Sequence, residues 1–187
     1  ERARLFGTAI STGLIDIVLA QEVERPAEPV VERWLEHRFD VAFAIGPEGA
    51  PVGLNGVADR VDLLPGRRLR VIDYKSGRAP EVRRALQVAV YAMCAQESLR
   101  ARDRQSWTVQ EAAYVALGDP KRTLAAVVDA DAPDAKREET LADARARLHE
   151  VLDGIARGEC PARPHEERWC RYCAYSSICR KDYIEDE

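Results

Sequence analysis

The sequence predicts one α/β domain followed by a cysteine-rich tail. Three observations predict this class. Short strand-like runs occur at residues 40–45, 54–62, 69–75, 110–117 and 123–129, and helical patterns lie before, between and after them. Four cysteines fall within the final segment. The 187 residues are enough for one well-cored domain. We therefore expect a core over residues 1–158 and a metal-binding segment over 159–187.

The first third of the chain predicts helices joined by a linker. Residues 5–20 have helical spacing, and Thr8 is a suitable N-cap. A linker over 21–28 is followed by a second expected helix over 29–38, which includes the WLEH sequence and leaves His37 at the surface. The strand over 40–45 comes next.

The segment Gly56–Gly77 predicts a β-hairpin that carries the most informative side chains. Pro65-Gly66 marks its turn, with Asp59 on the first strand and Asp73-Tyr74-Lys75 on the second. Side chains alternate along a strand, so Asp73 and Lys75 share one face and Tyr74 points to the other. Two carboxylates and one ammonium then converge, as metal-assisted phosphodiester hydrolysis requires. The competing interpretation is a solvated, charged hairpin.

Apolar residues before Asp73 favour the functional interpretation. Leu69, Val71 and Ile72 are typical of a buried strand, where a charged Asp-Tyr-Lys sequence needs a specific reason. The expected helix over 80–97 follows, with Pro80 in its first turn. Gln87 and Tyr91 are four residues apart and therefore share one face of that helix. This pair would suit a phosphate backbone, although an ordinary solvated face is the alternative.

The cysteines predict a metal site in the tail. Cys160, Cys170, Cys173 and Cys179 are spaced C-x9-C-x2-C-x5-C, and the C-x2-C loop lets two thiolates reach one metal. The odd total of five and the lack of a secretory segment disfavour disulfides, and Cys94 fits a helix core. The spacing leaves zinc and an iron–sulfur cluster open, and His165 could replace Cys160 in a zinc site.

Composition and charge set the remaining limits. Hydrophobic residues make up 46% and charged residues 32% of a chain with net charge −4. No apolar run approaches the roughly 20 residues of a membrane span, and no secretory signal is visible, so we expect a cytoplasmic protein. The charge is a mild argument against broad nucleic-acid affinity, but arginines near the hairpin allow a local basic groove.

Together these residues carry a resemblance to a known family. Gly56-x-x-Asp59, Asp73-Tyr74-Lys75-Ser76-Gly77 and Gln87-x-x-x-Tyr91 resemble the RecB-like branch of the PD-(D/E)XK nuclease superfamily. The resemblance implies a restriction-endonuclease-like fold, a central mixed sheet flanked by helices, and Mg²⁺- or Mn²⁺-dependent DNA cleavage. Asp59 and Asp73 would be metal ligands, with the Tyr74 carbonyl as a third. Lys75 would orient or activate the water, and Gln87 and Tyr91 would support the site next to DNA.

The same resemblance implies a cofactor and partners. Trp169–Cys179 resembles the segment that holds a [4Fe-4S] cluster in several RecB-like nucleases, with Cys160 as the local candidate for the fourth ligand. The implied substrate is single-stranded DNA or DNA ends, cut by an exonuclease in recombination or repair beside a helicase. Ser11 stands where family members often have a metal-binding histidine. The alternative is therefore a catalytically weakened DNA-binding or assembly module.

Overall fold

The computed structural model describes residues 2–24, 28–44, 50–118, 124–159 and 167–179. A five-stranded sheet has the order β1-β2-β3-β4-β5; β3 and β4 are parallel and the other neighbours antiparallel. The sheet is therefore mixed and flanked by helices, as expected. The elements are α1 (Arg2–Phe6), α2 (Leu14–Glu24), β1 (Glu32–Ala44), β2 (Pro51–Leu64), β3 (Arg68–Lys75), α3 (Gln87–Asp103), β4 (Thr108–Ala116), β5 (Leu124–Val128), α4 (Asp134–Ala156) and the 3-10 turn η2 (Glu167–Tyr172).

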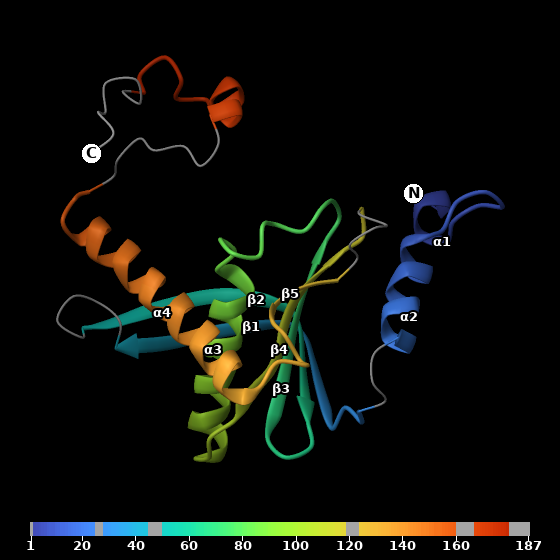
Figure 1. Ribbon diagram of the computed structural model, residues 1–187, viewed down its shortest axis with the longest axis horizontal. Helices are drawn as coiled ribbons and strands as arrows, with labels where there is room; N and C mark the ends of the chain where they lie inside the picture. Colours follow the sequence, from blue (N-terminus) through green and yellow to red (C-terminus); the bar gives the residue numbers. More distant parts are fainter. Residues whose placement is uncertain (1, 25–27, 45–49, 119–123, 160–166, 180–187) are drawn as a thin grey trace.

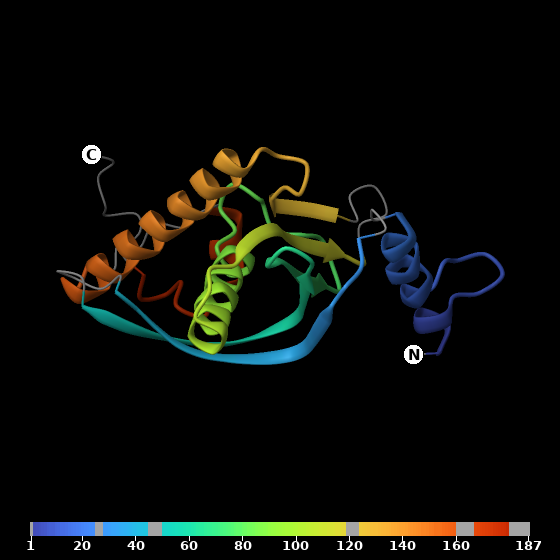
Figure 2. The same cartoon turned by 90° about the horizontal axis from the view of Figure 1, so that it is seen from below.

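Helix α3 lies in the concave face of the curved sheet and α4 crosses beside it, while α1 and α2 stand to one side (Figures 1 and 2). Small residues on α3, Ala92 and Ala95, are fully buried and let the helix approach the sheet closely. The core between α3 and the sheet includes Val61, Leu69, Val71, Val88, Leu99 and Val109. No helix among the described residues is long and apolar enough to cross a bilayer.

The expected helix over 29–38 is wrong, because residues 32–38 belong to β1, which continues through the strand expected from residue 40. It pairs antiparallel with β2, from Glu32 opposite Leu63 to Ala44 opposite Pro51. Backbone pairing with β2, the next strand along the chain, outweighs the helical preference of its residues. His37, expected at the surface, is instead half-buried and stacks on Trp34 with ring centroids 4.3 Å apart. Burial lowers the pKa of His37.

The expected helix over 5–20 is also corrected, since two helices replace it. Helix α1 ends at Phe6, and α2 begins only at Leu14. Gly7 has φ +73°, and an added Cβ at Gly13 would lie 2.4 Å from the Gly7 nitrogen. The turn between them depends on backbones that only glycine allows to approach so closely.

Helix α3 begins seven residues later than the expected helix over 80–97. A continuous helix would bond the Gln87 and Val88 N–H groups to the carbonyls of Arg83 and Arg84. Arg147 of α4 donates to both carbonyls instead, at 3.0 and 2.8 Å. The Val88 N–H donates to the Tyr114 hydroxyl at 3.2 Å. Tertiary contacts therefore break the helix and make Gln87 its first residue.

The close approach of β2 to α3 yields a stability prediction. An added Cβ at Gly56 would lie 2.8 Å from Cε1 of Tyr91, whereas Gly53 on the same strand has open space. Gly56→Ala should lower the free energy of unfolding by about 1–3 kcal/mol, because the Tyr91 ring must move. Gly53→Ala should leave it nearly unchanged. Urea denaturation of both variants measures this, and equal stabilities would contradict close packing of Tyr91 against Gly56.

Candidate active site

The ammonium of Lys75 joins the end of β3 to the start of α3. Lys75 Nζ lies 2.7 Å from Oδ2 of Asp73 and donates to Oε1 of Gln87 at 2.9 Å. The Asp73 side chain is 4% exposed and the Lys75 side chain 31%. The ion pair is therefore buried on its acidic side and open to solvent on its basic side.

Asp59 comes to the same place from β2. Arg60 pairs with Ile72 in the antiparallel register, so Asp59 and Asp73 are the next residues on the two strands. Asp59 Oδ2 accepts the Tyr74 N–H at 2.7 Å. The hairpin thus positions two carboxylates and one ammonium at one edge, and their oxygens are the donors that hard divalent cations prefer.

Tyr91 extends the polar line along α3. Gln87 Nε2 donates to the Tyr91 hydroxyl at 3.2 Å, and Gln87 is therefore bonded at both ends of its amide. Gly56 lies against the Tyr91 ring. The sequence-predicted residues Asp59, Asp73, Lys75, Gln87 and Tyr91 thus form one connected group, with their roles still a matter of proposal.

The surroundings of Asp73 disfavour its ionised form. Burial raises the pKa of Asp73; the Lys75 ammonium opposes the shift, and the Asp59 charge adds to it. The ionised form that a cation would bind is therefore destabilised when no cation is present.

The opposite face of the same strands carries a buried ion network. Arg60 lies within 2.5 Å of both Glu22 and Asp62 and donates to the Tyr74 hydroxyl at 3.1 Å. The Asp62 side chain is 0% exposed and also accepts from Arg33 at 2.7 Å. Tyr74 therefore points away from Asp73 and Lys75, as the alternation predicts, and this network holds its side chain.

Three contributing residues escaped the sequence analysis. Tyr114 lies in the otherwise apolar run Ala112–Ala116, where its hydroxyl was the available signal, whereas Arg60 stands between Asp59 and Asp62 on a strand with other polar residues. Arg147 lies on α4, and nothing in its local sequence marks its contact with the loop before α3.

The described residues show little of the metal sites that the sequence predicts. Within the part of the chain that the structure describes, no three His, Cys, Asp or Glu residues gather closely enough to hold an ion. Cys170, Cys173 and Cys179 are free thiols, while Cys160 and His165 lie outside the described residues. Ser11 lies in an exposed turn, where its hydroxyl bonds that of Thr8 at 2.8 Å.

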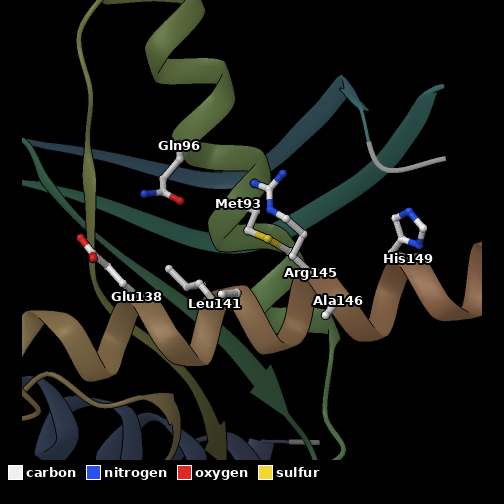
Figure 3. A pocket seen from close by; sticks show the side chains of 8 residues that line it. Met93, Gln96, Glu138, Leu141, Arg145, Ala146 and His149 are labelled. Carbon is white, nitrogen blue, oxygen red and sulfur yellow. The ribbon is translucent and has the colours of Figure 1, made fainter. Parts of the chain in front are cut away.

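A separate hollow of about 640 Å³ lies between α3 and α4. Met93 and Gln96 of α3 face Leu141 and Arg145 of α4 across it, and Glu138 and His149 lie at opposite ends (Figure 3). Its polar groups do not converge, and it shares no residue with the group around Lys75.

Comparison with known proteins identifies the family. The chain matches the PD-(D/E)XK nuclease superfamily over residues 8–180 and belongs to it. Nuclease action is the activity of that superfamily. No curated protein matches the chain. A solved structure titled "Crystal structure of SSO0001" is similar, with 16% identity and a TM-score of 0.43, covering 89% of this chain and 68% of that one.

Two buried aspartates on neighbouring strands should respond to pH in opposite ways. Because folding raises the pKa of Asp73, the protein in EDTA loses stability as pH rises from the unfolded value through the folded one. Asp73→Asn should remove that loss and stabilise the metal-free protein at neutral pH. The gain should vanish at a pH below the pKa of the unfolded chain.

Asp62→Asn provides the matched control. Burial opposes ionisation of Asp62, but hydrogen bonds from Arg60 and Arg33 hold its pKa below the ordinary value. Its stabilising contribution is complete above the unfolded pKa and is lost as pH falls through the folded one. The variant should lose about 3 kcal/mol at neutral pH and progressively less in acid. Urea denaturation from pH 3 to 8 measures both; shifts of the same sign would contradict this assignment.

Proposed function

We propose that this chain is a metal-dependent deoxyribonuclease of the RecB-like branch. The observation that carries the proposal is the Lys75 ammonium, which bonds Asp73 and Gln87 at once. An amine held at the edge of an acidic pair is suited to the attacking water or the scissile phosphate. Membership of the nuclease superfamily supports the same activity.

Asp59 and Asp73 are the proposed ligands for Mg²⁺ or Mn²⁺, with the Tyr74 carbonyl as a third. The donor set is all oxygen, which fits a hard cation, and water would complete its coordination. When bound, the cation would polarise the phosphate and lower the pKa of the attacking water. It would also offset the burial, and the smaller effect of the Asp59 charge, that raise the pKa of Asp73.

The remaining residues would position the attacking water and the Lys75 ammonium. Lys75 orients the water and stabilises charge that develops on the phosphate. Gln87 holds Lys75, and Tyr91 holds Gln87, so the amine keeps its direction while its outer side stays open to the substrate. Single-stranded DNA or DNA ends, an exonuclease mode and a helicase partner are the substrate and context that we propose from the resemblance.

The tail is proposed as a separate metal-binding segment over 159–187, following a nuclease core over 1–158. Cys170, Cys173, Cys179 and Cys160 would hold a [4Fe-4S] cluster, with zinc as the alternative. The free thiols of the first three are compatible with either. The Cys173 N–H donates to the Cys170 carbonyl at 3.2 Å, a turn that keeps this C-x2-C pair on one short loop.

The second candidate function is a DNA-binding or assembly module without strong catalysis. The position of Ser11 favours it, because a hydroxyl bonded to Thr8 in an exposed turn is a poor substitute for a metal-binding histidine. The connected group from Asp59 to Tyr91 favours the nuclease.

The nuclease prediction is tested on labelled single-stranded DNA with Mn²⁺. Asp73→Ala and Lys75→Ala should each lower the cleavage rate at least about a hundredfold, since each removes charge stabilisation of the reacting phosphate. Asp143→Ala and Lys136→Ala, exposed residues of α4, are the matched controls and should cleave as wild type does. Equal rates for all five proteins would remove the proposed site. DNA binding without cleavage by any of them would favour the second candidate.

The cluster prediction uses Cys94 as an internal standard. Burial raises the pKa of Cys94 to about 11, and the residue is 2% exposed, so iodoacetamide at pH 8 should not label it in the folded protein. Cys170, Cys173 and Cys179 should be labelled in metal-free protein and protected in anaerobically purified protein. Mass spectrometry of the peptides measures this, and iron content with a visible absorbance shoulder separates the cluster from zinc. Equal labelling of the tail in both preparations would contradict a bound metal.

A further inference from the structure

We propose that Tyr114 is a positioning residue for Lys75, its ring supporting the ammonium and its hydroxyl fixing the start of the helix that carries Gln87. The inference deepens the proposed function and rests on it. Tyr114 neither reaches the substrate nor binds the cation in this scheme; it acts through Lys75.

The ring of Tyr114 lies beneath the ammonium. Tyr114 on β4 is the register partner of Asp73 on β3, so the two side chains are neighbours on the same face of the sheet. Lys75 Nζ is 5.4 Å from the ring centroid, within the ~6 Å over which an aromatic face attracts a cation. Tyr114 is 1% exposed, and little solvent weakens that attraction from below.

The hydroxyl of Tyr114 holds the start of α3. It accepts the Val88 N–H at 3.2 Å, and Val88 is fully buried. The helix does not satisfy this N–H itself, because Val88 lies in the first turn of α3 and the Arg84 carbonyl, which accepts from Arg147, comes before the helix begins. A buried N–H must have a partner, so the Tyr114 hydroxyl determines where the first turn of α3 lies.

Both contacts of Tyr114 bear on the same atom, Lys75 Nζ: the ring directly, and the hydroxyl through Val88 and Gln87. Gln87 precedes Val88 in the chain, and its Oε1 accepts from the same Lys75 Nζ that lies over the ring. A lysine amine on four flexible carbons needs several contacts to keep one direction. Asp73 alone would leave it free to swing; Tyr114 restricts it from below and, through Val88 and Gln87, from the side.

Two substitutions separate the contributions of the ring and the hydroxyl. Tyr114→Phe keeps the ring and removes the hydroxyl, and should lower kcat by about threefold or less. Tyr114→Leu keeps apolar bulk but removes both, and should lower kcat about five- to tenfold with KM for DNA little changed. Val109→Ala, a buried change on the same strand, is the control for general destabilisation and should leave kcat as in wild type.

The decisive measurement is a double-mutant cycle with Lys75→Ala under single-turnover conditions. If Tyr114 acts through Lys75, Tyr114→Leu should have no further effect on the cleavage rate once Lys75 is removed. An equal loss in both backgrounds would overturn the proposal while leaving the nuclease assignment intact. If Lys75→Ala itself cleaves like wild type, the proposed function fails instead.

An NMR measurement tests the contact between Lys75 and Tyr114 without an activity assay. Lys75, Lys121, Lys136 and Lys181 are the lysines of the chain, so the side-chain methylene spectrum is simple to assign. The signals next to Nζ of Lys75 should be shifted upfield by the ring in wild type and in Tyr114→Phe, and return to the ordinary lysine position in Tyr114→Leu. Lys75 signals that are the same in all three proteins would overturn the proposal.

Discussion

The arrangement of the site depends on where helix α3 begins. Gln87 reaches the Lys75 ammonium only because it is the first residue of the helix, beside the end of β3. In a helix continuing from residue 80, the N–H groups of Gln87 and Val88 would bond the carbonyls of residues 83 and 84. Arg147 takes two of these carbonyls and Tyr114 takes one N–H, so side chains from α4 and β4 determine the geometry of the acidic edge.

The two faces of the hairpin treat buried charge differently. On the outer face, Asp62 is surrounded by arginines that favour its ionised form. On the face toward α3, Asp73 has one partly exposed lysine and a second carboxylate nearby, and burial raises its pKa. The first arrangement stabilises the fold. The second is strained without a further positive charge, as is common where a protein trades stability for function.

Tyr74, whose side chain points to the opposite face from Asp73 and Lys75, links the two faces of the hairpin. Its backbone N–H fixes Asp59 on one side, while its hydroxyl accepts from Arg60 on the other. Arg60 in turn pairs with Glu22, so α2 is bonded to the strand that carries the Asp-Tyr-Lys sequence. Glu22 lies near the end of α2, which stands beside the sheet (Figure 2), and Ser11, at the position where the family often has a histidine, lies in the turn before that helix.

Local patterns in the sequence were sufficient for the hairpin, the shared face of Asp73 and Lys75, and the helical pair Gln87 and Tyr91. Each follows from strand or helix periodicity within a few residues. Only the tertiary structure decided that residues 32–38 extend the strand expected from residue 40, that α3 begins at Gln87, and that Tyr114 and Arg147 support it. The strand depends on its pairing with β2, and the start of α3 depends on hydrogen bonds between residues 26 to 64 positions apart; local periodicity encodes neither.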